Sequence, residues 1–137
     1  MSRNYSGQPD LSKLSAVALT SSYGDARSFT IETGGMTDLV LYISYTMGAT
    51  ETSNSIEVKV ESGQTATDLH RLTTLSTSGG TVTLTAVEYT FVGTNAAEAK
   101  FALPLMVADK YVKFSFKETG VATNAGTVTA KITTSGE

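Results

Sequence analysis

A single histidine limits the chemistry that this chain could perform. His70 is the only His among 137 residues, and the chain contains no Cys. A Ser-His-Asp triad would need His70 as its base, and Asp68 is the nearest acid in the sequence. In an extended segment these two side chains share a face, but side by side on one strand they do not form the relay of a triad. We therefore interpret His70 as an exposed residue at a strand end, and we predict no catalytic residue.

Candidate metal ligands are scattered along the chain. Zinc requires clustered Cys and His, and only one such residue is present. Calcium requires several oxygens from one loop, whereas the aspartates occur singly, at Asp10, Asp25, Asp38, Asp68 and Asp109. We expect no metal and no cofactor, although a site assembled from distant loops stays open.

Two further motifs also favour structure over chemistry. Glu57 and Glu61 could be a glycosidase pair, but four residues apart on a strand they lie about 13 Å from one another, beyond either hydrolytic geometry. With Lys59 between them they are typical of an alternating charge row on a solvated face. The stretch "STSGGTVT" (76–83) lacks the Lys and the strand-to-helix context of a phosphate loop, so it predicts a hairpin turn.

Alternation of apolar and polar residues defines the elements. In "YVKFSFKETG" (111–120), the residues Val112, Phe114 and Phe116 point one way, which predicts a strand with one face on a core and one toward water. Similar segments are predicted at 14–20, 27–33, 38–47, 55–62, 70–75, 81–92, 99–107 and 126–134. The segment 38–47 is apolar on both parities, which indicates a central strand covered on both sides.

Two of these strands carry irregularities. The segment 81–92 changes parity near Ala86, which predicts a β-bulge there or a bend between two sheets. Pro104 cannot donate to a strand ladder, so we expect an edge position or an outward-facing amide there. Around Asn95 to Ala99 the sequence allows one helical turn.

These elements predict an all-β fold, an antiparallel β-sandwich of jelly-roll type. The polar segment 1–12 is expected to be an extended N-terminal arm, followed by one sandwich domain over 13–137.

Charge and composition exclude some partners. The net charge is −3 and the sequence pI is about 5.1, which argues against nucleic acid. No apolar run approaches the ~20 residues that cross a bilayer, so we expect no membrane partner. The absence of Cys, and of a signal-peptide pattern in "MSRNYSGQPD", predicts synthesis and folding in a cytoplasm.

Several residues are candidates for a partner interface. Arg3, Tyr5 and Pro9 in the N-terminal arm are residue types suited to docking, and Tyr111 and Lys113 lie on the wet face of their strand. Lysines 110, 113, 117 and 131 could gather into a basic patch, although solubility and edge protection are the simpler role. Tyrosines 42, 89 and 111 could line a sugar-binding face, but Trp, the strongest residue for that role, is absent.

The C-terminal third, "ADKYVKFSFKETGVATNAGTVTAKITTSGE", resembles the ending of small β-sandwich proteins encoded among phage head and structural genes. The stretches "SNSIEVKVESGQTATDLHRLTT" and "TDLVLYISYTM" fit the same pattern, so the resemblance covers roughly residues 36–134. The chain departs from the commoner pattern because no Trp follows the "ESG" turn.

The resemblance implies a non-enzymatic virion protein, in particular a head decoration (cement) protein on the capsid surface. Its partner would be the major capsid protein at junctions between hexamers, and it would be a homotrimer made in the host cytoplasm. Alternatives are a tail, fibre or neck component of similar fold, or a glycan-binding adhesion module.

Overall fold

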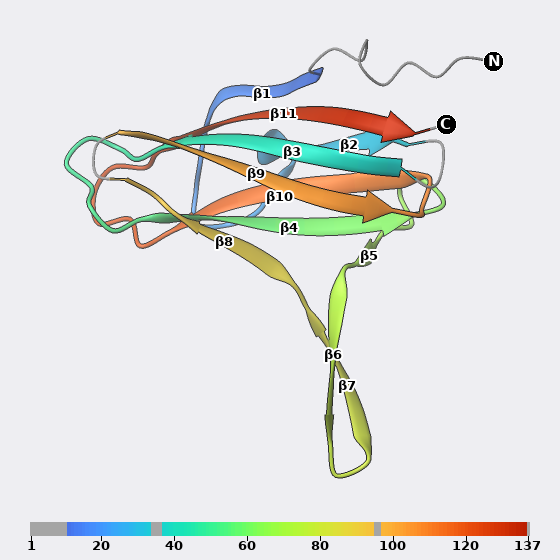
Figure 1. Cartoon of the computed structure of the whole chain (residues 1–137). Helices are drawn as coiled ribbons and strands as arrows, with labels where there is room; N and C mark the ends of the chain where they lie inside the picture. Colours follow the sequence, from blue (N-terminus) through green and yellow to red (C-terminus); the bar gives the residue numbers. More distant parts are fainter. Residues whose placement is uncertain (1–10, 34–36, 95–96, 137) are drawn as a thin grey trace.

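The computed structural model describes residues 11–33, 37–94 and 97–136, and these residues form two packed antiparallel sheets with one long projection (Figure 1). The only helical element among them is a short 3-10 turn, η1 (Asp25–Arg27). The predicted all-β sandwich is therefore confirmed. Arg3, Tyr5 and Pro9 lie outside the described residues.

The first sheet, sheet A, has the strand order β1-β11-β3-β9. Its strands are β1 (Leu11–Ala18), β11 (Thr127–Gly136), β3 (Thr37–Thr46) and β9 (Glu98–Val107). Pro104 lies in β9, opposite Val40 of β3, and β9 is an edge strand as expected. The central position predicted for β3 is also confirmed.

The second sheet, sheet B, has the order β2-β10-β4, and two short strands share the far edge of β4. Its strands are β2 (Ser28–Glu32), β10 (Tyr111–Thr119), β4 (Ser55–Gly63), β5 (His70–Arg71) and β8 (Glu88–Val92). β8 pairs with the first half of β4, and β5 pairs with the second half. A break in the edge of sheet B therefore lies between β5 and β8.

The chain winds by crossing between the two sheets. From β1 to β4 each successive strand lies in the opposite sheet, and the same alternation holds from β8 to β11. Such crossing brings strands distant in sequence together, as in β1 with β11 and β2 with β10. This winding is consistent with the jelly-roll type expected from the sequence.

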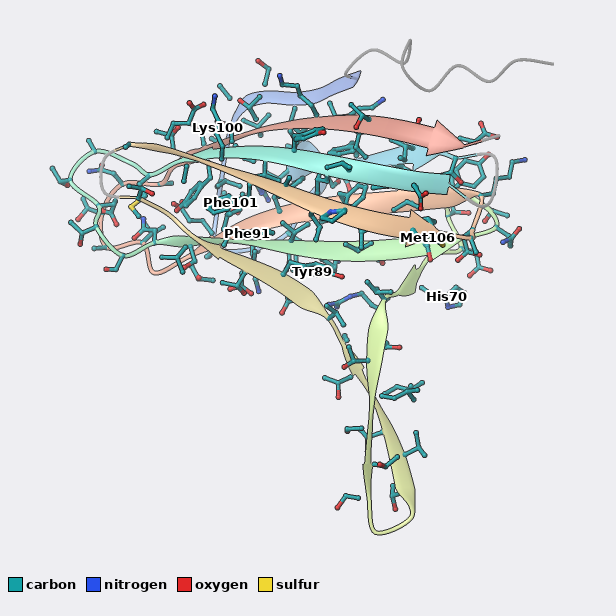
Figure 2. The ribbon with its side chains drawn as sticks, viewed as in Figure 1. His70, Tyr89, Phe91, Lys100, Phe101 and Met106 are labelled. Carbon is teal, nitrogen blue, oxygen red and sulfur yellow. The ribbon has the colours of Figure 1, made fainter. Side chains whose placement is uncertain are left out.

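The core lies between the sheets and follows the alternation in the sequence. Alternate residues of β3, β4, β10 and β11 are buried, among them Leu41, Val58, Phe114 and Ile132, each with no exposed surface. β8 and β9 lie at the edges of the two sheets, and a ring contact between Phe91 and Phe101 links them, with the ring centroids 4.7 Å apart (Figure 2).

One expectation for the sheets was wrong. The outer face of β3 is not covered, because Tyr42 is 41% exposed and Val40 is only half-buried. Apolar residues on both parities therefore reflected an apolar patch on an open face. The helical turn that the sequence allows at 95–99 lies partly outside the described residues; of the described ones, Ala97 makes a bridge to Thr94 and β9 begins at Glu98.

The remaining two strands leave the sandwich altogether. β6 (Thr73–Ser78) and β7 (Thr81–Ala86) pair only with each other among the described strands. They extend through the break in the edge of sheet B and away from the body (Figure 1). We call this element, Thr73–Ala86, the projecting hairpin.

Candidate interaction surfaces

Two glycines form the turn at the tip of the projecting hairpin. Ser78 pairs with Thr81, so Gly79 and Gly80 form a two-residue loop with φ of +57° and +83°. A two-residue loop with positive φ at both positions is a type I′ turn, for which Gly-Gly is a favoured sequence. The hairpin turn predicted from "STSGGTVT" is confirmed.

The projecting hairpin has two chemically different faces. Cross-strand pairs put one set of side chains on a first face, the apolar face: Thr73 and Ala86, Leu75 and Leu84, Thr77 and Val82. The other face carries only hydroxyl side chains, in the pairs Thr74 and Thr85, Ser76 and Thr83, Ser78 and Thr81. Strict period-two alternation in "TVTLTA" creates this division.

The apolar face is uncovered. Leu75 is 70% exposed, Leu84 is 64% exposed and Val82 is 59% exposed, and every residue of β6 and β7 is classed as exposed. Residues 72–87 contain no Asp, Glu, Lys or Arg. Exposed strands are normally protected by charges, and a lone two-stranded hairpin is marginally stable in water. An uncharged, half-apolar hairpin of this kind is typical of a protein contact surface.

The base of the projecting hairpin is fixed to sheet B. The Leu72 amide donates to the Val60 carbonyl (N–O 3.0 Å), and the Val87 amide donates to the Leu72 carbonyl (2.9 Å). Arg71 Nη2 donates to the Val87 carbonyl at 3.3 Å. The parity change near Ala86 therefore marks the point where the chain leaves the hairpin and joins sheet B, the second of the two explanations offered by the sequence.

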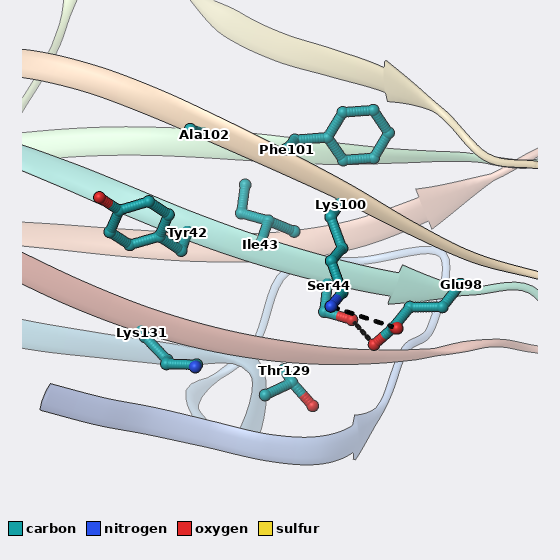
Figure 3. A pocket seen from close by; sticks show the side chains of 9 residues that line it. All are labelled: Tyr42, Ile43, Ser44, Glu98, Lys100, Phe101, Ala102, Thr129 and Lys131. Carbon is teal, nitrogen blue, oxygen red and sulfur yellow. Dashed lines mark hydrogen bonds and ion pairs between the residues drawn. The ribbon is translucent and has the colours of Figure 1, made fainter. Parts of the chain in front are cut away.

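A second candidate surface is a concavity of about 600 Å³ on the outer face of sheet A (Figure 3). Two cross-strand rows line the concavity, and each row takes one residue from β11, β3 and β9 in that order. The first row is Lys131, Tyr42 and Ala102, and the second is Thr129, Ser44 and Lys100. Glu98 accepts a hydrogen bond from the Ser44 hydroxyl and lies 3.8 Å from Lys100 Nζ. The concavity combines one exposed aromatic ring with hydroxyl and charged groups.

The interface predicted around Tyr111 and Lys113 is only partly open. Both side chains are half-buried on the outer face of sheet B, and Ser115, on the same face, is buried. The chain's own Tyr23 lies over this face, because Lys59 Nζ and Lys117 Nζ each lie 4.8 Å from its ring centroid. The face predicted to be wet is thus partly occupied by the loop before β2.

Tyr23 belongs to a charged cluster on that face. Its hydroxyl donates to Glu88, whose carboxylate also lies 3.7 Å from Lys117 Nζ. The hydrogen bond from Tyr23 holds the pKa of Glu88 below its ordinary value, while burial and the Glu88 carboxylate raise the pKa of Tyr23. The cluster is internally paired, which favours a structural role.

The other predicted groupings are separated by the fold. Lys113 and Lys117 lie on sheet B, whereas Lys131 lies on sheet A, so the four lysines do not form one patch. Tyr42 lies on the outer face of sheet A, Tyr111 on the outer face of sheet B, and Tyr89 packs against the core. The three tyrosines therefore do not share a sugar-binding face.

His70 lies where the sequence predicted it. It is the first residue of β5, and its Nε2 lies 3.2 Å from Asp68 Oδ1, with both side chains 76% exposed (Figure 2). The pair stands in solvent at the foot of the projecting hairpin. Glu61 lies 3.6 Å from Lys59, in the charge row expected for β4.

Two buried carboxyl groups, those of Glu118 and Glu51, hold neighbouring segments together through hydrogen bonds. Glu118 has no exposed surface; it accepts from the Tyr45 hydroxyl, from Asn54 Nδ2 at 3.3 Å and from the Gly126 amide at 2.8 Å. Burial and the bond to Glu118 raise the pKa of Tyr45, so this hydroxyl remains a donor. Each oxygen of the Glu118 carboxyl group is therefore bonded inside the protein.

Glu51 performs the same task for the loop before β11. Its carboxylate accepts three backbone N–H bonds, from Ala122 at 2.8 Å, Thr123 at 2.9 Å and Asn124 at 3.0 Å. These backbone donors lower the pKa of Glu51 to about 2. The arrangement fixes the loop to the segment between β3 and β4.

Residues 11–33, 37–94 and 97–136 contain no candidate metal site and no candidate membrane-spanning helix. No group of three or more His, Asp or Glu side chains there could hold a metal ion. No helix in the described part of the chain has the length and apolar character needed to cross a membrane. Comparison of the chain with known protein families, curated proteins and solved structures found no match.

Sequence reasoning missed the projecting hairpin. Residues 70–75 and 81–92 were interpreted as strands of the sandwich, because their alternation resembles that of the body strands. A signal was present in the absence of charge over 72–87, since the outward positions of the body strands β4 and β10 carry Glu57, Lys59, Glu61 and Lys117.

Proposed function

We propose that this protein is a non-enzymatic structural component of a larger protein assembly, and that the assembly is a phage virion. The observation that supports the proposal is the projecting hairpin, an uncharged element with an exposed apolar face, carried on a body whose buried carboxyl groups, Glu51 and Glu118, are hydrogen-bonded inside the protein. Such a molecule contributes binding surface and rigidity, and it needs no catalytic group.

Within a virion we assign it the role of a capsid decoration (cement) protein, following the sequence resemblance. The major capsid protein would be its partner, at junctions between hexamers on the outer capsid surface, with a homotrimer as the oligomer that the resemblance implies. Many copies spread over capsid joints would act mechanically, because expansion pressure would have to break several interfaces together. The rigid, close-packed core suits such a load.

The test is binding to assembled heads of the virus that encodes the chain, prepared without it. The purified chain should co-sediment with expanded heads, and electron microscopy should place it on the outer surface. Localisation to a tail, fibre or neck would transfer the structural role to that component. Absence from the particle would contradict the proposal.

Two variants sharpen this test. Replacing Thr73–Ala86 by an Asn-Gly turn keeps the Leu72–Val87 closure and removes the projecting hairpin. We expect at least a tenfold loss of particle affinity, because avidity or a direct contact is lost. Deletion of residues 1–10 tests the N-terminal docking residues Arg3, Tyr5 and Pro9 separately, and should also weaken binding.

A glycan-binding module is the second candidate, and it rests on the concavity of sheet A. There Tyr42 is 41% exposed beside the hydroxyls of Ser44 and Thr129, a combination that could stack on a sugar and bond its hydroxyl groups. A glycan array would test it: binding that Tyr42→Ala abolishes and Tyr111→Ala preserves would favour this function over the structural one.

A further inference from the structure

We propose that the projecting hairpin binds a second copy of this chain, its apolar face packed against the same face of the partner hairpin about a two-fold axis. This inference rests on the proposed assembly role and names one contact within it. The pair would be a miniature sandwich of two two-stranded sheets, about 10 Å apart, with Leu75 and Leu84 at its centre.

The first argument is the division of the hairpin into two faces. A free-standing amphipathic hairpin is half of a sandwich, because its apolar side chains have a sheet beneath them and no described strand above them. A second identical hairpin supplies the missing layer. The hydroxyl face of each hairpin then points outward to water, where its Ser and Thr side chains remain solvated.

The second argument is the order of side chains along the apolar face. The Leu75–Leu84 pair is the middle of three, with Thr73–Ala86 at the base and Thr77–Val82 toward the tip. If two hairpins lie antiparallel, the Leu pair meets its own copy and the tip meets the base. Val82 then lies over the small Ala86 of the partner, so a large side chain faces a small one at both ends.

The third argument is charge. Around a two-fold axis each residue near the axis faces its own copy, so any charge there would be opposed by an equal charge. Residues 72–87 carry none. The body strand β4, by contrast, displays Glu57, Lys59 and Glu61 on its outer face, a surface that would not pair with itself in this way.

The geometry also leaves room for the two bodies. Six residues per strand give the projecting hairpin a length of about 20 Å, so antiparallel overlap holds the two sandwiches apart at opposite ends. Nothing lies within 4 Å of the Cβ positions that would be built at Gly79 and Gly80, so the tip is unobstructed. Other surfaces of the body stay available for a capsid contact or for a trimer.

Self-association is the direct test. Sedimentation equilibrium of the full chain should give a higher mass than the double variant Leu75→Ser with Leu84→Ser, and twice its mass where the bodies do not associate by themselves. We expect these substitutions to weaken the pairing by at least about a hundredfold. The matched control, Ser76→Ala with Thr83→Ser, alters the hydroxyl face and should keep the wild-type mass. Circular dichroism must show that the body of each variant remains folded.

Because the chain has no Cys, single-cysteine cross-linking tests the orientation. A short bis-maleimide should link two copies of Leu84→Cys efficiently, since position 84 faces itself across the axis. Thr83→Cys places the thiols on opposite outer surfaces, and we expect at least tenfold less cross-linked product.

Three results would overturn the inference. They are equal masses for the wild type and the double Ser variant, equal cross-linking at positions 83 and 84, and pairing lost in the hydroxyl-face control. If the wild type is monomeric yet particle binding needs the projecting hairpin, the occupant of the apolar face is another protein. The proposed function would then survive while this inference would not.

Discussion

The sandwich body and the projecting hairpin use the same strand chemistry with opposite results. In the body, alternate apolar residues such as Leu41 and Phe114 are fully buried, and the outward positions carry charge. In the hairpin, Leu75 and Leu84 lie on the apolar face, but they are 70% and 64% exposed. No charged residue occurs in the sequence 72–87 around them.

The difference shows that alternation specifies a face to be covered, not the molecule that covers it. The body supplies a second sheet within its own chain, and buried apolar area there stabilises the fold at about 25 cal/mol per Å². In the free chain the apolar face of the hairpin is exposed and buries no comparable area. With the pairing proposed above, its contribution would appear in association and not in the stability of the free chain.

The same chemical change should consequently have very different effects in the two regions. Leu41→Ala removes a fully buried side chain, and we expect it to lower the free energy of unfolding by about 2–5 kcal/mol. Leu84→Ala in the monomeric chain should change it by no more than about 0.5 kcal/mol. Urea unfolding at a concentration where the chain is monomeric measures both. Similar losses for the two variants would mean that the hairpin packs onto its own body.

A second contrast concerns tyrosine hydroxyls inside and outside the body. Tyr45→Phe removes a donor from the buried carboxyl of Glu118, and we expect a cost of about 1.5–3 kcal/mol. Tyr42→Phe, on the open face of sheet A, should stay within about 0.5 kcal/mol of the wild type in the same urea titration. Equal effects would show that the carboxyl group of Glu118 does not depend on its tyrosine partner.

The body could be predicted from the sequence to a large extent. The strands at 55–62, 99–107 and 111–120 lie within a residue or two of β4, β9 and β10, because their alternation, flanking turns and Pro104 all indicate the same structure. The edge position of Pro104 follows from its missing N–H. The central position of β3 follows from its run of apolar residues.

The candidate interaction surface could not be predicted in the same way. Alternation at 81–86 is indistinguishable from that of a body strand, since period two reports a strand and not its sheet. Tyr23 covers part of the outer face of sheet B, near Lys117, through a contact that spans most of the chain length, and no local sequence pattern records such a contact. The networks around Glu51 and Glu118 were missed for the same reason.

The body should also respond to acid through Glu51. Its folded pKa of about 2 lies below the ordinary value of 4.5, so its stabilising contribution is fully present above about pH 4.5 and is lost as the pH falls toward 2. Glu51→Gln should be less stable at neutral pH and should lose less stability over that window. Asp25→Asn, at an exposed site in η1, is the control and should keep the wild-type slope. Identical slopes for all three proteins would contradict the assignment.

The smallest expected effect tests whether the two regions fold independently. Gly80 has φ of +83°, and an alanine there costs about 1–2 kcal/mol, whereas Asn at position 79 suits a type I′ turn. In the monomeric chain we expect Gly80→Ala to speed amide hydrogen exchange in β6 and β7 several-fold, and Gly79→Asn to leave it nearly unchanged.

Exchange in β10 should not respond to either substitution, because the hydrogen bonds described at the base of the hairpin come from the Leu72 and Val87 backbone and from Arg71. Local opening of the hairpin then leaves the core closed. If Gly80→Ala also accelerated exchange in β10, strain at the tip would be reaching the core, and the two regions would form one cooperative unit. In that case the exposed Leu75 and Leu84 would have to contribute to the stability of the free chain, and the contrast between body and hairpin would fail at its source.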